Sequence, residues 1–152
     1  MNTMEDLAEW AGQFDLTLSS GQLQQFALYE RLLQEWNERI SLTAIRDSRQ
    51  IRIRHFLDSL SCATITGPLD HQSLIDIGSG AGFPGLPLKI LYPGMYLTLV
   101  ESVAKKTRFL EMIVASLSLL NVEVINSRAE DVSRDPDHRE SHDWAVGRAV
   151  AE

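Results

Sequence analysis

Residues 74–87 read LIDIGSGAGFPGLP, an apolar run followed by closely spaced glycines and prolines. The run at 74–77 is typical of a short strand that is buried on both faces. Gly78, Gly80 and Gly82 follow and lack Cβ atoms, so the backbone can turn sharply and bring its N–H groups close to a ligand. A proline just after them can occupy the first turn of a helix, where a missing N–H costs little. A strand, a glycine loop and a helix in this order place a ligand at the carboxyl end of a parallel strand.

Two classes of ligand suit this loop. Residues 80–85 match the G-x-G-x-x-G pattern, so a dinucleotide of the nicotinamide type is one interpretation. Asp76 favours S-adenosylmethionine, because a carboxylate at the strand end suits the ammonium of a methionine moiety and would repel a pyrophosphate. Phe83 and Pro84 favour the same ligand, since their bulk hinders the approach of a pyrophosphate to the helix start. A tight turn without a ligand is disfavoured, because so many glycines are costly unless the backbone is used.

The composition indicates one domain, or one domain with a small N-terminal appendage, in a chain of 152 residues. Cys62 is the single cysteine, so no disulfide can form within the chain, which fits a reducing compartment. The sequence holds no apolar run near the ~18 residues of a membrane span. Its acidic N-terminus lacks the pattern of a signal peptide. We therefore expect a cytoplasmic location and no membrane partner.

The net charge of −7 argues against a protein that wraps nucleic acid over its whole surface. A local basic face is still compatible with it. Four arginines within nine residues are opposed only by Asp47: Arg46, Arg49, Arg52 and Arg54. A patch that contacts phosphates and a solvated helix face are both open interpretations of this group.

The first 66 residues have the apolar spacing of helices, which we expect at about 4–14, 20–40 and 48–65. Ser19 and Gln22 resemble a capping box at the start of the second helix. Trp36 lies on that helix's apolar stripe, which favours a core position over stacking on RNA.

His55 and Asp58 share a face of the third helix. No further His, Cys or carboxylate cluster completes a metal or acid–base site around them, so a structural hydrogen bond to a neighbouring element is the favoured interpretation. We predict neither a metal site nor a catalytic side chain.

Residues 67–73 are polar and read as a linker into a second unit, so we divide the chain into a helical segment, 1–66, and a core, 67–152. Strands are expected at 74–77, 96–100, 122–125 and 143–150. Helices are expected at 86–91 and from a cap at Ser102 to Leu117. Strands that alternate with helices of this length indicate an α/β fold with a mainly parallel, right-handed sheet.

Further residues, at the ends of the second, third and fourth strands, belong to the predicted ligand site. Glu101 ends the second strand, nineteen residues after Gly82, where a carboxylate accepts hydrogen bonds from both hydroxyls of a ribose. The residues after the third strand would flank an adenine edge. Arg148, near the end of the fourth strand, either contacts the ligand or forms a salt bridge with Glu130 or Asp131.

Several motifs occur in an order that resembles the RsmG (GidB) family of bacterial ribosomal RNA methyltransferases. They are Trp36-Asn37, Leu42-Thr43, RHFLDSL at 54–60, DIGSGAGFPG at 76–85, SRAE at 127–130 and Arg148-Ala149. The resemblance implies a class I, Rossmann-like methyltransferase domain behind a helical N-terminal segment. It also implies that this chain is an N-terminal fragment that lacks the last strands of the domain.

The same resemblance implies transfer of the methyl group of S-adenosylmethionine to N7 of one guanine in 16S ribosomal RNA, free or within the small-subunit particle. Gly78 and Phe83 would bind the cofactor, Ala129 and Glu130 would flank its adenine, and Arg148 would line the site. Because N7 already carries a lone pair, the reaction needs no general base, and alignment alone can supply roughly 7–11 kcal/mol at the extreme. The alternatives are a nicotinamide-dependent oxidoreductase and a non-enzymatic module that docks on RNA or protein.

Overall fold

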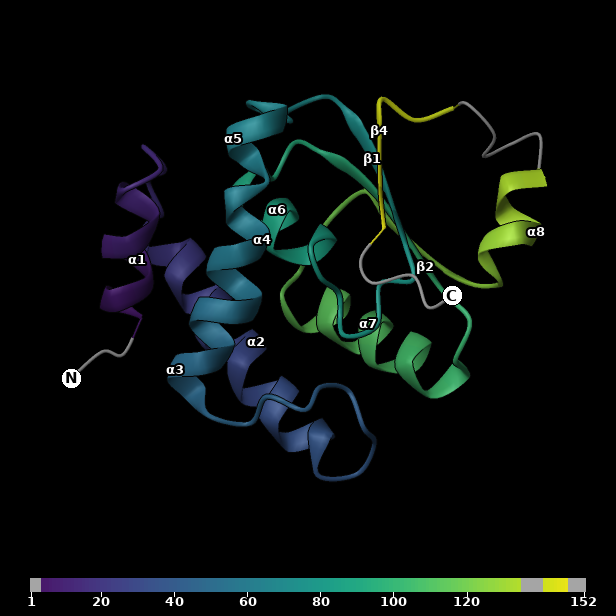
Figure 1. The fold of residues 1–152 in the computed structure, drawn as a ribbon, viewed down its shortest axis with the longest axis horizontal. Helices are drawn as coiled ribbons and strands as arrows, with labels where there is room; N and C mark the ends of the chain where they lie inside the picture. Colours follow the sequence, from purple (N-terminus) through teal and green to yellow (C-terminus); the bar gives the residue numbers. More distant parts are fainter. Residues whose placement is uncertain (1–3, 135–140, 148–152) are drawn as a thin grey trace.

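The computed structural model describes residues 4–134 and 141–147. Its N-terminal part is helical, and Figure 1 shows these helices stacked on one side of the sheet. In chain order they are α1 (Glu5–Gly12), α2 (Ser20–Asn37), α3 (Ser48–Ile51), η1 (Arg52–Leu57), α4 (Asp58–Ser61) and α5 (Ala63–Thr66). The helical character that the apolar spacing predicts for the first 66 residues is confirmed.

Helix α2 begins with the predicted capping box. The Ser19 hydroxyl accepts the Gln22 amide hydrogen at 3.1 Å, and the Gln22 side chain accepts the Ser19 amide hydrogen at 2.7 Å. The helix ends at Asn37, earlier than the expected residue 40. The Asn37 side-chain oxygen accepts the amide hydrogens of Leu42 and Thr43 at 2.9 and 3.1 Å, which turns the chain away from the helix.

The third predicted helix is not uniform. Between α3 and α4 lies η1, a π-helical stretch whose hydrogen bonds span five residues instead of four. Arg52 in η1 is only 5% exposed and pairs with Glu30 at 2.9 Å and with Asp6 at 3.0 Å. Arg52 therefore does not belong to an exposed basic face, because a buried guanidinium must be matched by carboxylates within the fold.

The sheet is parallel throughout and has the strand order β3-β2-β1-β4. Its strands are β1 (Ser73–Ile77), β2 (Tyr96–Glu101), β3 (Val122–Asn126) and β4 (Trp144–Gly147). The predicted parallel α/β sheet is confirmed. The last expected strand begins at Trp144 and pairs with β1, while residues 148–150 of that prediction lie outside the described residues.

Helices cover the sheet unequally. Helices α6 (Gly85–Leu91) and α7 (Ala104–Ser116) pack on one face, together with α2, around residues such as Leu74, Leu97 and Leu99. On the other face, Val132 of α8 (Ala129–Arg134) meets Ile75 and Val100. Figure 1 shows α8 separated from α6 and α7 by the strands.

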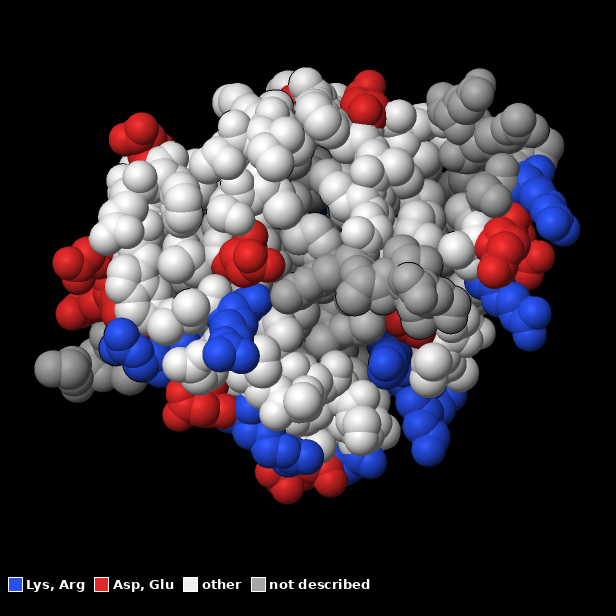
Figure 2. Space-filling view, in the orientation of Figure 1, with Lys and Arg blue, Asp and Glu red and all other residues white. Residues whose placement is uncertain are grey.

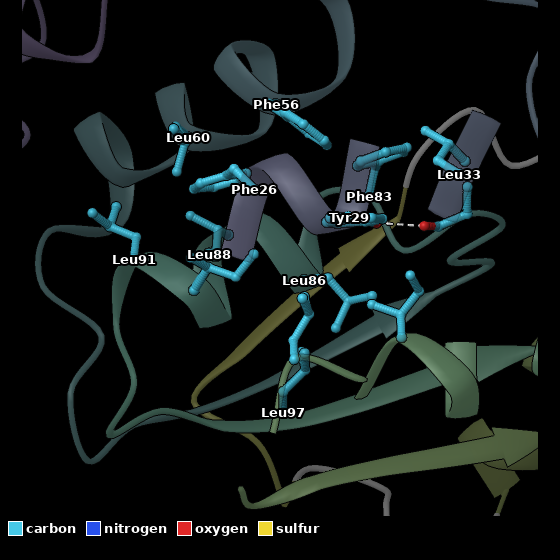
Figure 3. Packing of buried hydrophobic residues seen from close by; sticks show 14 of the residues in the cluster. Phe26, Tyr29, Leu33, Phe56, Leu60, Phe83, Leu86, Leu88, Leu91 and Leu97 are labelled. Carbon is cyan, nitrogen blue, oxygen red and sulfur yellow. Dashed lines mark hydrogen bonds between the residues drawn. The ribbon is translucent and has the colours of Figure 1, made fainter. Parts of the chain in front are cut away.

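A single cluster of buried residues joins the helical segment to the sheet. Figure 3 shows Phe26 and Tyr29 from α2 above Leu86, Leu88 and Leu97. Trp36 is half-buried and packs against the core as predicted, with 5.6 Å between its ring centroid and that of Phe109 in α7. None of the helices in 4–134 and 141–147 has the length and hydropathy of a membrane span.

Candidate cofactor site

The glycine loop joins β1 to α6 at the carboxyl edge of the sheet. The amides of Gly78 and Ser79 both donate to the Val100 carbonyl, at 2.9 and 3.0 Å, so the loop begins fixed to the neighbouring strand. Gly78, Gly80 and Gly82 all have positive φ angles, of 71°, 58° and 104°. Residues that carry a side chain rarely adopt a positive φ angle, which explains why three glycines alternate here.

The three glycines serve two different purposes. A Cβ atom built on Gly78 or Gly80 meets no atom of the described residues within 4 Å, so their α-carbons border open space. A Cβ on Gly82 would instead lie 2.5 Å from Leu86 Cδ1 and 2.6 Å from the Tyr29 hydroxyl. Gly78 and Gly80 therefore leave space at the surface of the loop, whereas Gly82 leaves space for the side chains of Leu86 and Tyr29.

The Asp76 side chain links the end of β1 to the start of α6. Its side chain is fully buried, and Oδ2 accepts the amide hydrogen of Gly85, the first residue of α6, at 2.9 Å. A carboxylate in this place is stabilised by the unsatisfied amide hydrogens at the start of a helix. The contact of Asp76 with a methionine ammonium stays a prediction.

Glu101, at the end of β2, connects the loop to α7. It is 5% exposed, and its Oε1 accepts the Gly80 amide hydrogen at 2.9 Å while Oε2 accepts the Val103 amide hydrogen at 2.7 Å. The cap predicted at Ser102 is wrong: the N-cap residue is Val103, which has no side-chain acceptor. Each oxygen of a carboxylate can accept a second hydrogen bond, so Glu101 retains capacity for a ribose hydroxyl.

The end of β3 lies beside Glu101. The Ser127 amide and the Asn126 side chain both donate to the Glu101 carbonyl at 3.1 Å. Ala129, half-buried, and Glu130, exposed, then open α8. The fold therefore gathers Gly78, Gly80 and Glu101 at one edge, with Ala129 and Glu130 close after the neighbouring strand. Arg148 lies outside the described residues.

Phe83 is positioned differently from the other predicted residues. Phe83 is 4% exposed, and its ring is stacked with the His55 ring at 4.4 Å and with the Tyr29 ring at 5.6 Å, with interplanar angles of 5° and 14°. The ring thus packs into the N-terminal helices. A contact of Phe83 with a cofactor would use its main chain.

Two helical residues that the sequence did not single out as site residues touch the loop. The Tyr29 hydroxyl donates to the Ala81 carbonyl at 2.5 Å, and Figure 3 shows Tyr29 beside Phe83. His55 Nε2 lies 2.7 Å from Thr43 Oγ1, which confirms the predicted structural hydrogen bond. The sequence offers one indication of this contact: Tyr29 places a hydroxyl on an apolar helix stripe, and a buried hydroxyl needs a hydrogen-bond partner.

Two hollows formed by the described residues lie away from this edge. One of about 210 Å³ is bordered by Leu33 and Asn37 of α2 and by Ile51. Another opens at the amino ends of the strands, beside Ser73 and Asn121. The described residues contain no group of three or more His, Cys, Asp or Glu side chains suited to a metal ion.

Comparison with known proteins assigns the family. The profile of the family described as "GidB: rRNA small subunit methyltransferase G" matches residues 22–152. The chain belongs to the GidB family. The parallel sheet with its glycine loop is accordingly a class I, Rossmann-like methyltransferase fold, as the sequence predicted.

Curated GidB relatives are similar along the chain. The ribosomal RNA small subunit methyltransferase G of Roseiflexus castenholzii is 55% identical over 149 residues, which cover 98% of this chain and 63% of the relative. That of Alkaliphilus oremlandii is 42% identical over 151 residues, 99% of this chain and 63% of the relative. The chain thus spans 63% of the length of both relatives.

A solved structure supports the fold alone. A crystal structure of a mutant of MtNAS superposes with a TM-score of 0.54 at 17% sequence identity, over 87% of this chain and 50% of that chain.

Proposed function

We propose that this GidB chain binds S-adenosylmethionine at the carboxyl edge of its sheet and serves methyl transfer to N7 of a guanine in 16S ribosomal RNA. The observation that carries the proposal is the pairing of an open glycine loop with Glu101. Its carboxylate accepts the Gly80 amide hydrogen at 2.9 Å at the position where this class of fold holds a ribose.

The open space beside Gly78 and Gly80 fits a cofactor that lies against the loop backbone. In this proposal Glu101 accepts the ribose hydroxyls, Ala129 and Glu130 flank the adenine, and Arg148 lines the site. Asp76 contributes negative charge for the methionine ammonium from beneath the loop.

The cofactor supplies a methyl group that is already activated for attack by a nucleophile. The chain's own residues then have to bind and align, and the carboxylates at the site have no proton to remove, because guanine N7 carries a free lone pair. Alignment of this kind can contribute several kcal/mol, roughly 7–11 at the extreme.

An RNA partner is supported by the distribution of basic residues. Figure 2 shows Lys and Arg side chains along the lower part of the molecule, where α7 and the end of α2 lie in Figure 1. Exposed basic residues of the described chain include Arg46, Arg49, Arg54, Lys105, Arg108 and Arg128. Phosphate contacts by such residues bind RNA even though the net charge of the chain is −7. We also propose that this reaction takes place in the cytoplasm.

Titration calorimetry with S-adenosylhomocysteine tests the cofactor assignment. We expect binding by the unaltered chain and at least about tenfold weaker binding by Glu101→Ala, since two charge-assisted hydrogen bonds are lost. Glu111→Ala, an exposed acid on α7, is the matched control and should bind as the unaltered chain does. Binding of NADH in place of S-adenosylhomocysteine, or of neither compound, would contradict the proposal.

Methyl transfer is measured separately, with labelled S-adenosylmethionine and unmodified 16S ribosomal RNA, supplied free and as small-subunit particles. Label at guanine N7 is the expected product. RNA binding with no cofactor affinity would instead support a docking module.

A further inference from the structure

The glycine loop has two sides, and the N-terminal helices occupy one of them. Gly78 and Gly80 border open space. Ala81, Gly82 and Phe83 face Tyr29 of α2 and His55 of η1, with the contacts given above. The side that would not touch the cofactor is therefore shaped by residues from a different part of the chain.

Tyr29 is fitted closely to the loop. Its side chain is fully buried, its hydroxyl donates to the Ala81 carbonyl, and the same hydroxyl lies 2.6 Å from where a Cβ of residue 82 would be. Since a buried hydroxyl is costly without a partner, this hydrogen bond favours a single position of the Ala81 carbonyl.

His55 is itself held in place. Its Nε2 lies 2.7 Å from the Thr43 hydroxyl. The Thr43 main chain is bonded twice to the Asn37 side chain, at 2.9 Å and 3.1 Å. A continuous set of contacts thus runs from the end of α2 to the ring of Phe83 in the loop. His55 also lies in the π-helical stretch, a geometry that occurs frequently at functional sites.

We propose that Tyr29 and His55 are positioning residues of the cofactor site: they hold the glycine loop in the shape that leaves its Gly78–Gly80 side open. The helical segment, 1–66, then contributes to cofactor binding by positioning the loop, in addition to packing against the sheet. This inference rests on the proposed function, because it takes the ligand of the loop to be the cofactor named there.

The test compares two loop-contacting variants with a matched core variant. Tyr29→Phe keeps the ring and removes the hydrogen bond, while His55→Leu removes the flat ring beside Phe83. Phe26→Leu is the control, because Phe26 is fully buried and packs on Phe56, at 5.0 Å, in the same cluster. For each chain the Kd for S-adenosylhomocysteine is measured by calorimetry and the unfolding free energy by urea denaturation.

We expect the Kd to rise about fivefold to tenfold in Tyr29→Phe and His55→Leu. Each variant loses one hydrogen bond or ring contact that holds the loop in the conformation that binds the cofactor. In Phe26→Leu the Kd should stay within about twofold, although a large buried side chain is truncated and stability falls. A merely structural role would make the Kd follow the stability loss in all three variants, and that result would overturn the proposal. So would an unchanged Kd in both loop-contacting variants.

A second measurement separates this inference from the proposed function. The amide NMR signals of Gly78, Gly80 and Gly82 are recorded without ligand for the same chains. Signals displaced in Tyr29→Phe but not in Phe26→Leu support the inference, and signals unchanged in Tyr29→Phe overturn it. If the unaltered chain binds no S-adenosylhomocysteine, the proposed function fails, and these spectra still decide whether Tyr29 shapes the loop.

Discussion

Asp76 and Gly85 are joined across the glycine loop by a hydrogen bond of 2.9 Å, in which the buried carboxylate accepts the first amide hydrogen of α6. The aspartate lies on β1, nine residues earlier in the chain, yet it performs the task of a helix cap. A Cβ on Gly85 would lie 2.9 Å from the same carboxylate oxygen, so a glycine is needed for this close approach.

Asp76→Ala should therefore lower the unfolding free energy by about 1–3 kcal/mol, because the Gly85 amide loses its partner in a buried site. Urea denaturation of the ligand-free chain measures this loss. The exposed Asp131→Ala in α8 provides the comparison and should change stability by less than about 0.5 kcal/mol. Equal stability of Asp76→Ala and the unaltered chain would remove the capping role.

Gly82→Ala should be strongly destabilising, by about 2–4 kcal/mol, because a φ of 104° is strained for alanine and the new methyl group would overlap Leu86 and Tyr29. Gly12→Ala offers a control at the end of α1, where a Cβ meets no described atom within 4 Å. That substitution should be neutral or stabilising by up to about 1 kcal/mol. Thermal unfolding of both variants should show opposite or clearly unequal shifts of Tm.

Arg52→Met should lower the unfolding free energy by about 3–5 kcal/mol, since Glu30 and Asp6 would lose the buried guanidinium that neutralises them. Adding Glu30→Gln to the same chain should restore part of the loss. The exposed pair Arg31–Glu35, 3.7 Å apart, gives the contrast: Arg31→Met should change stability by less than about 0.5 kcal/mol. Equal effects of the two arginine substitutions would show that Arg52 is not structurally special.

The pH dependence of stability should carry a contribution from Glu30. Burial raises the pKa of Glu30 above its usual value of 4.5, and the nearby Arg52 charge opposes this shift only in part. Between the unfolded and the folded pKa the folded chain binds more protons, so the contribution of Glu30 makes the unfolding free energy fall as pH rises through that window.

Urea denaturation of the unaltered chain and of Glu30→Gln, repeated at several pH values from 4 upward, isolates this contribution. The stability of the unaltered chain relative to the variant should decline with rising pH and then level off. A relative stability that instead increases with pH would mean that the Arg52 charge outweighs burial at Glu30.

Local features of the fold could be predicted well from the sequence. The apolar run with alternating glycines at 78, 80 and 82 requires a strand followed by a turn with positive φ, because only glycine adopts that backbone shape without strain. The capping box at Ser19 and Gln22 is equally local, since its two hydrogen bonds join residues three positions apart.

Features that depend on distant partners could not be predicted in this way. In the sequence Arg52 cannot be distinguished from its exposed neighbours, because its partners Glu30 and Asp6 lie far away along the chain. Tyr29 likewise looks like an ordinary core residue, because its partner, the Ala81 carbonyl, comes from a distant loop.

The strands, the glycine loop and the family could be inferred from residue spacing along the chain, whereas the short helix α8 was not foreseen. The folded chain was needed to see that Gly82 makes room for Tyr29 while Gly78 and Gly80 border open space, and that the Phe83 ring stacks with His55 and Tyr29. These features differ because the burial of a side chain and its hydrogen-bond partner are set by residues that approach it from elsewhere in the chain, which no local pattern encodes.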